Sequence, residues 1–75
     1  MGIDHESATP VYEQLAGILR DMIRSGEIPS DRPLPSVKRL MQTYGVAQGT
    51  AEHAVRLLKE EGLVKTVIGK GVYVK

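Results

Sequence analysis

Hydrophobic residues recur at helical spacing over the first third of the chain. The apolar positions that share this spacing are Val11, Leu15, Ile18, Leu19, Met22 and Ile23. Steps of three and four residues place them on one face of an α-helix. Thr9 and Pro10 fit the N-cap and the first helical position. Ser25 and Gly26 fit the helix end, so we predict an amphipathic helix between these two signals.

Two shorter helices are predicted in the middle of the chain, joined by the turn Tyr44-Gly45-Val46. The first follows Ser36, a good N-cap, and its predicted inward-facing residues are Val37, Leu40, Met41 and Tyr44. The second runs from about Gln48 to Glu61, and its predicted inward-facing residues are Ala51, Ala54, Val55 and Leu58. Its first turn holds no large apolar residue, so we expect that end to face something outside the domain.

The pattern changes after Gly62. Two β-branched runs, 63–68 and 72–75, flank Gly69-Lys70-Gly71 and predict a β-hairpin. The proline-rich stretch 29–35 excludes helix and favours a short extended segment at 32–34. Three helices followed by a hairpin predict a mainly α fold with a small β-hairpin, the winged helix-turn-helix. The predicted core packs the first helix against Leu40, Val55, Leu58, Leu63 and Tyr73.

Length and composition limit the possible classes of protein. The 75 residues predict one domain at 9–75 and a mobile N-terminal tail at 1–8. The absence of cysteine excludes a disulfide framework and a thiolate metal site, and it fits a reducing cytoplasm. No stretch has the length of a secretory signal or a membrane span. We expect no metal, no cofactor and no enzyme, because no nucleophile–base or ligand cluster stands out.

The charges are unevenly distributed along the chain. Residues 1–35 carry three arginines and six carboxylates, a net charge of −3, whereas residues 36–75 carry seven cations and three carboxylates, a net of +4. The basic half contains the predicted helix-turn-helix and hairpin. A basic surface is typical of nucleic-acid binding, although ordinary solvated lysines explain the charge equally well.

Three groups of residues are candidate DNA contacts. At the start of the second helix these are Ser36, Lys38 and Arg39. At the start of the third helix they are Gln48, Gly49, Thr50, Glu52 and His53. At the hairpin tip they are Gly69, Lys70 and Gly71. Helix N-termini and cations attract phosphates, and Gln, Thr and Glu can bond base edges. Structural roles compete: Ser36 as a cap, the tip glycines as turn residues, and His53 as a solvated or structural side chain.

Several motifs together resemble one family. They are Pro10-Val-Tyr-Glu-Gln-Leu, Ile23-Arg-Ser-Gly-Glu-Ile, Leu34-Pro-Ser, Tyr44-Gly-Val, Ala54-Val-Arg-Leu-Leu, Glu61-Gly-Leu-Val and Gly69-Lys-Gly-Val-Tyr-Val. From about Thr9 to Val74 the chain resembles the N-terminal domain of GntR-family bacterial transcriptional regulators. The resemblance implies a winged helix-turn-helix that binds a near-palindromic double-stranded operator as a homodimer. It also implies a cytoplasmic, nucleoid-associated regulator, which we expect to be a repressor. It also implies a C-terminal effector-binding or oligomerisation domain, so the chain is either an excised domain or a short protein that dimerises otherwise.

The chain departs from the family pattern at four positions. Lys38 stands where arginine is usual and cannot make its bidentate contact. Ala47 and Gln48 replace a usual Ser-Arg pair, and Glu52 stands where another arginine is common. These departures imply an unusual base preference. They also motivate a different hypothesis, a winged-helix protein–protein module with weak or no DNA binding, which the salt dependence of DNA binding would separate from the first.

Overall fold

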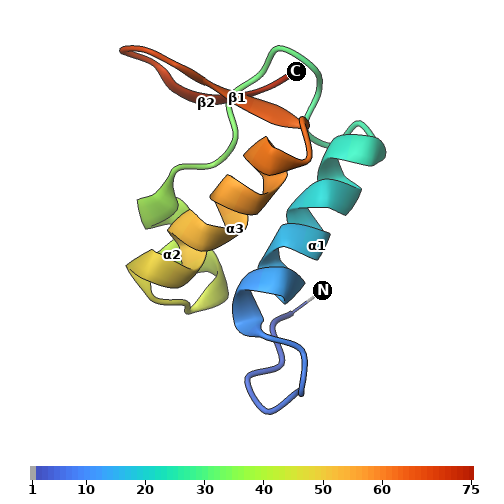
Figure 1. Cartoon of the computed structure of the whole chain (residues 1–75), viewed down its shortest axis with the longest axis vertical. Helices are drawn as coiled ribbons and strands as arrows, with labels where there is room; N and C mark the ends of the chain where they lie inside the picture. Colours follow the sequence, from blue (N-terminus) through green and yellow to red (C-terminus); the bar gives the residue numbers. More distant parts are fainter. Residues whose placement is uncertain (1) are drawn as a thin grey trace.

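A computed structural model describes residues 2–75. The elements follow the order α1 (Val11–Arg24), α2 (Val37–Tyr44), α3 (Gln48–Glu60), β1 (Val64–Val67) and β2 (Gly71–Val74), as Figure 1 shows. The two strands pair antiparallel in the register Val64↔Val74 to Val67↔Gly71. The predicted fold class, three helices and a hairpin wing, is confirmed.

Helix α1 begins one residue later than the sequence predicts. Pro10, not Thr9, is the N-cap residue, and no side chain caps the helix. The backbone of Pro10 is extended, with φ −54° and ψ 144°, so it cannot be the first helical residue. Its carbonyl still accepts the amides of Glu13 and Gln14, at 3.0 and 3.2 Å. The assignment of Thr9 as the cap is therefore wrong.

The segment before α1 folds back toward the helix. The side chain of Gln14 accepts the amide of Asp4 and donates to its carbonyl, both at 2.8 Å, and also donates to the carbonyl of Thr9. The predicted tail, 1–8, begins at Met1, which lies outside the described residues. Its mobility stays a prediction.

Helix α2, which precedes the tight turn into α3, is well specified at both of its ends. The Ser36 hydroxyl accepts the amide of Arg39 at 3.1 Å, which confirms Ser36 as the N-cap of α2. Gly45 ends α2 with φ 65°, a left-handed conformation that favours glycine. Val46 is buried between the helices. The helix-turn-helix predicted from the sequence is confirmed.

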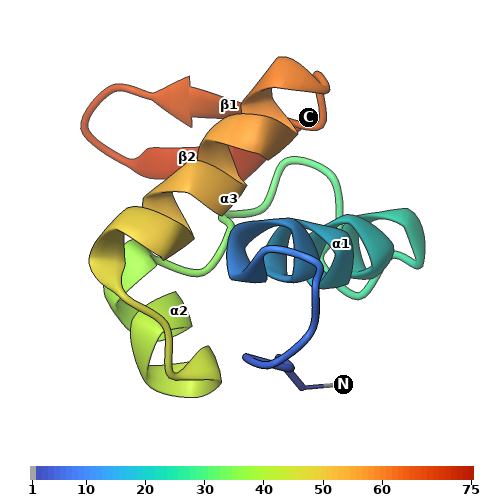
Figure 2. The same ribbon diagram turned by 60° about the horizontal axis from the view of Figure 1, so that its bottom comes forward.

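The linker after α1 joins the sheet. The amides of Asp31 and Leu34 donate to the carbonyls of Val74 and Val72, and the amide of Val74 donates to Arg32, at 2.8–2.9 Å. An isolated bridge between Pro33 and Tyr73 completes this pairing. The predicted extended segment thus lies along β2 as a third, irregular strand and fixes the wing to the helical body (Figure 2).

The core lies where α1 and α3 pack together and the wing closes over their ends. The fully buried larger side chains are Leu15, Leu19, Leu40, Leu58, Val64 and Val74. Ala16, Ala51 and Ala54 are also fully buried, and their small side chains permit close approach of the helices. The prediction that Ile18 and Tyr73 belong to the core is wrong. Both side chains are only half-buried and lie outside the core cluster. Tyr73 projects from the opposite face of β2 to Val74, because successive strand residues alternate.

One ion pair connects α1 to the end of α3. Arg20 donates two hydrogen bonds to the two carboxylate oxygens of Glu61, from Nε to Oε1 at 2.7 Å and from Nη2 to Oε2 at 2.5 Å. These hydrogen bonds lower the pKa of Glu61 and raise the pKa of Arg20. Both side chains are partly exposed, at 30% and 25%, so solvent weakens the pair. The bidentate contact connects α1 to the C-cap residue of α3.

Within residues 2–75, no helix is long and apolar enough to span a bilayer. The same residues hold no group of three or more His, Cys, Asp or Glu side chains that could bind a metal ion.

Candidate nucleic-acid interface

The three predicted groups of contact residues lie on one side of the molecule. In Figures 1 and 2, α2, the first turns of α3 and the hairpin tip all lie opposite α1. The helix-turn-helix positions the two helix starts, and the pairing of β2 with residues 31–34 positions the hairpin. The fold therefore gathers segments that are distant in the sequence onto a common face.

The start of α2 presents two cations beside a helix N-terminus. Lys38 and Arg39 are both exposed. Ser36 is exposed and already accepts the amide of Arg39, but its hydroxyl proton remains able to donate to a phosphate oxygen. The structural role and the predicted contact role of Ser36 are therefore compatible.

The start of α3 is open to solvent. Gln48, Gly49, Glu52 and His53 are exposed, whereas Thr50 is half-buried. Ala47 is the N-cap residue of α3, and it makes no capping hydrogen bond because its side chain has no acceptor. The orphan amides of the first turn therefore remain available to water or to an anionic partner.

His53 has a specific neighbour that the sequence did not indicate. Its ring stacks on Tyr12 of α1, with the ring centroids 3.7 Å apart and the planes inclined by 9°. This contact covers one face of the imidazole and draws the side chain toward α1. A contact between His53 and DNA stays a prediction. The alternative, a structural role for His53, is supported by its stacking on Tyr12.

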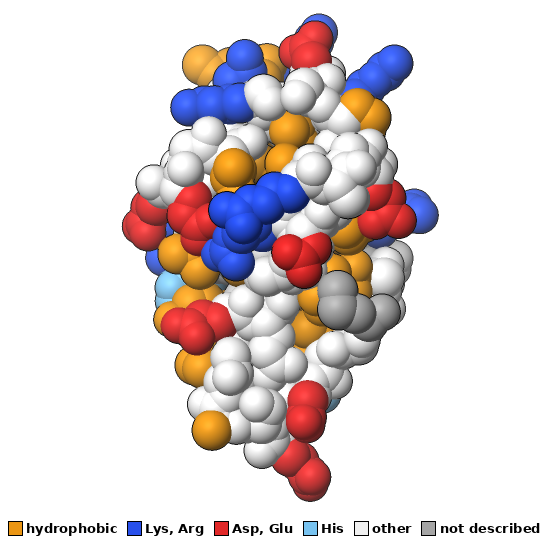
Figure 3. Space-filling model, turned by 90° about the vertical axis from the view of Figure 1, so that its right-hand side faces the viewer, with side chains coloured by type: hydrophobic (Ala, Val, Ile, Leu, Met, Phe, Trp, Pro, Cys, Tyr) orange, Lys and Arg blue, Asp and Glu red, His pale blue; other side chains and the backbone are white. Residues whose placement is uncertain are grey.

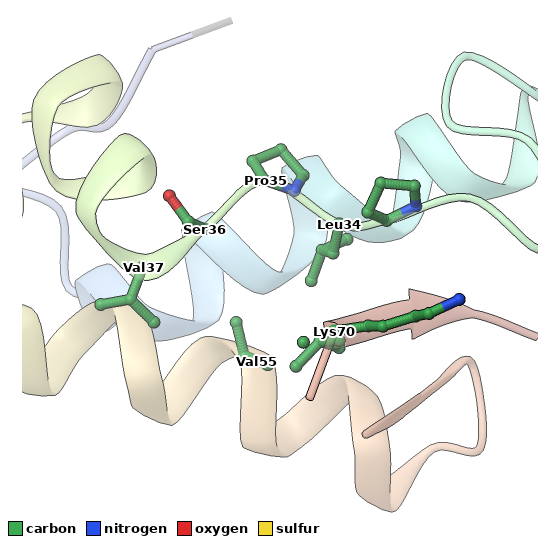
Figure 4. Close-up of a pocket in the computed structure, with 9 residues that line it drawn as sticks. Leu34, Pro35, Ser36, Val37, Val55 and Lys70 are labelled. Atoms are coloured by element: carbon green, nitrogen blue, oxygen red, sulfur yellow. The ribbon is translucent and has the colours of Figure 1, made fainter. Parts of the chain in front are cut away.

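A hollow of about 280 Å³ separates the hairpin from the start of α2 (Figure 4). Its lining residues are Pro33, Leu34, Pro35, Ser36, Val37, Val55, Lys70, Gly71 and Val72. Ser36 and Lys70, predicted separately from α2 and the wing, thus border the same space. The side chains of Val37 and Val55 form its base, while Lys70 directs its amine away from them.

A second hollow continues along α3. It shares Val37, Val55 and Val72 with the first, and its remaining lining residues are Glu52, Arg56 and Lys59. Together the two hollows form a groove, here called the wing groove, between α3 and the hairpin. Arg56 and Lys59 are exposed cations on the outer face of α3 that the sequence analysis missed. The available signal was helical spacing: Arg56 follows Glu52 by four residues, and Lys59 follows Val55 by four.

The opposite side of the molecule has a different character. Figure 3 shows the α1 side, where acidic, basic and hydrophobic side chains are interspersed. No extended surface of a single charge is visible in that view. The wing groove is bordered by three cations, Arg56, Lys59 and Lys70, and by one carboxylate, Glu52.

Three helices, an exposed start of α3 and a projecting antiparallel hairpin define the chain as a winged helix-turn-helix domain. Residues 11–74 match the model of the family described as "Bacterial regulatory proteins, gntR family". The chain belongs to this family, which confirms the resemblance drawn from its motifs.

Relatives and solved structures agree with this assignment. The chain is 34% identical over 74 residues to the HTH-type transcriptional repressor NagR of Bacillus subtilis, covering 99% of this chain and 30% of NagR. It is 32% identical over 72 residues to the repressor YtrA of the same organism, covering 96% of this chain and 55% of YtrA. The crystal structure of AraR(DBD) in complex with operator ORR3 is similar over 100% of this chain and 90% of that one, with a TM-score of 0.86 and 31% identity.

Proposed function

We propose that this chain binds double-stranded DNA sequence-specifically, as the operator-binding domain of a bacterial transcriptional repressor. The observation that carries the proposal is the wing groove, which places exposed cations between the open start of α3 and the hairpin tip. The names of NagR and YtrA as repressors, and the AraR complex with an operator, support it.

The geometry suggests how a duplex would lie. The start of α3 enters the major groove, where Gln48 can pair with adenine and Glu52 can accept from cytosine. The hairpin tip reaches the adjacent minor groove. The sugar-phosphate strand between the two grooves then passes along the wing groove, beside Arg56, Lys59 and Lys70. Lys38 and Arg39 contact phosphates from the start of α2.

The proposal extends to the assembly in which this domain works. The chain spans 30% and 55% of the lengths of NagR and YtrA. We propose binding as a homodimer to a near-palindromic operator in the cytoplasm, at the nucleoid, because two-fold protein symmetry requires two related half-sites. An effector ligand would act through a further domain of the regulator.

A titration of the labelled chain with a duplex at low salt tests the proposal directly. We expect amide chemical-shift changes at 36–39, 48–53 and 69–71, together with binding that weakens steeply as salt rises. Salt-independent binding, or shifts confined to α1, would contradict DNA binding by this face. Such a result would favour a winged-helix protein–protein module, a second candidate motivated by Gln48 and Glu52, which replace cationic residues of the family pattern.

Gly49 provides a prediction that separates stability from binding. A Cβ at Gly49 would meet nothing within 4 Å in the free protein. Gly49→Ala should therefore stabilise α3 by about 0.5–1 kcal/mol. We expect the same variant to bind DNA more weakly if the backbone there approaches a base or phosphate closely. Thermal denaturation and a duplex titration measure the two effects.

One result for Gly49→Ala would contradict close approach of the α3 backbone to DNA. A variant that is more stable and binds as tightly as the wild type would show that the α3 backbone at this point does not approach DNA. Glycine would then only weaken the start of the helix.

A further inference from the structure

The tip of the wing carries an exposed isoleucine. Ile68 is 97% exposed, and among residues 2–75 it is the one large hydrophobic side chain left in solvent. Single exposed apolar residues are common on protein surfaces. The position of Ile68 distinguishes it, because the residue lies at the outermost point of an element proposed to enter a groove of DNA.

Ile68 lies in the tight turn that joins the two strands. The amide of Lys70 donates to the carbonyl of Val67 at 3.0 Å, which closes a four-residue turn with Ile68 second and Gly69 third. Gly69 has φ 79°, the positive value that the third position of a type II turn requires. Ile68 therefore lies in the turn with glycine beside it on one side, and its side chain is almost wholly in solvent.

The hairpin that carries Ile68 is hydrogen-bonded to the rest of the domain. β1 and β2 form a continuous ladder, and β2 is bonded on its other edge to residues 31–34. The β-branched side chain of Ile68 also has few rotamers, so little conformational freedom is lost when it is fixed. In Figures 1 and 2 the tip extends beyond the helices on the side of α2.

We propose that Ile68 contacts the floor of the DNA minor groove and makes the wing select base pairs that lack a guanine amino group. The inference rests on the proposed DNA binding and adds a specificity-determining residue to it. The minor groove is about 6 Å wide, and apolar side chains such as isoleucine occur as wedges in it. Lys70, two residues away, supplies the cation for the flanking phosphates.

The selectivity follows from hydrogen bonding. Guanine presents its N2 amino group in the minor groove, whereas A·T pairs present only acceptors there. An isoleucine pressed against that amino group would remove it from water without offering an acceptor. Binding next to G·C pairs is therefore penalised, while the floor of an A·T or I·C step accommodates the side chain.

Inosine isolates this effect, because it lacks the minor-groove amino group of guanine and keeps the same major-groove edge. The experiment compares alternating duplexes of dI·dC and dG·dC, with dA·dT as a reference. We expect the wild-type chain to bind dI·dC roughly tenfold more tightly than dG·dC. Ile68→Ala should abolish this difference, mainly by weakening dI·dC binding, whereas Ile68→Val should retain most of it.

Two controls accompany the comparison. Lys70→Ala should weaken binding to all three duplexes and lower the slope of log affinity against log salt by about 1, with the dI·dC preference intact. Ile68→Ala should leave that slope and the melting temperature unchanged, because Ile68 is exposed in the free protein.

Each outcome decides the inference. It is overturned if the wild type does not distinguish dI·dC from dG·dC, if Ile68→Ala keeps the distinction, or if that variant weakens both duplexes equally. Salt-dependent wild-type binding in those cases leaves the proposed DNA binding in place. Absence of binding to every duplex would instead overturn the proposed function and this inference together.

Discussion

Replacing Arg56 and Lys59 together by alanine should weaken DNA binding roughly a hundredfold at low salt and lower the salt slope by about 1.8. Both side chains are exposed and line the wing groove between α3 and the hairpin. A duplex engaged by α3 and the wing tip must pass one strand through this groove. Each cation would then neutralise one phosphate and release its counterion.

The matched control removes two cations elsewhere. Arg24→Ala with Lys75→Ala changes the net charge by the same amount but leaves the wing groove intact. Affinity and salt slope for all three proteins come from fluorescence titrations at several salt concentrations. If the control pair lowers the slope as much as the Arg56 and Lys59 pair, net charge rather than contact explains the effect.

Leu58→Ala should reduce the free energy of unfolding by about 3 kcal/mol. Leu58 is fully buried in α3, and its carbonyl also accepts the amide of Leu63 where the chain turns into the wing. The loss is a large share of the roughly 4–11 kcal/mol expected for a domain of this size. The midpoint of thermal unfolding should fall by roughly 15 °C.

The neighbouring leucine provides the comparison for Leu58. Leu57 lies in the same helix but is only half-buried, so Leu57→Ala removes the same atoms from a partly solvated site. We expect it to cost less than half as much as Leu58→Ala. Equal losses in urea denaturation would show that the buried position assigned to Leu58 is wrong.

The helices could be predicted from the sequence because their signals are local. Apolar spacing locates the inward faces, and glycines 26, 45 and 62 follow the helix ends. The start of α1 was misplaced by one residue because Thr9 and Pro10 satisfy two adjacent positions of the same signal. The backbone angles of Pro10 decide between them.

The wing shows where local signals are insufficient. Val72, Tyr73 and Val74 are all apolar, so the alternation of polar and apolar residues cannot indicate which face is inward. The pairing partners settle this: Val74 lies opposite Val64 on the buried face, and Tyr73 lies opposite Lys65 on the other. The pairing of residues 31–34 with β2 is likewise a long-range contact without a local signature.

The candidate site was predictable at its two helix starts and at the hairpin tip. Arg56 and Lys59 were missed because their relevance depends on the hairpin lying beside the middle of α3. Tyr12 and His53 are 41 residues apart, and nothing in their sequence context indicates that their rings stack. Both features arise from tertiary packing rather than from helical periodicity.

The pairing of the 31–34 linker with β2 has a consequence for how the protein folds and opens. The bonded residues are roughly 40 positions apart, so closing this loop costs more entropy than forming any helix turn. We expect the helices to assemble first and the sheet to be completed last. The amides of Asp31, Leu34 and Val74 should therefore exchange with solvent deuterium together and sooner than those in the middle of α3. A single local opening would release both the wing and the connection that positions the start of α2.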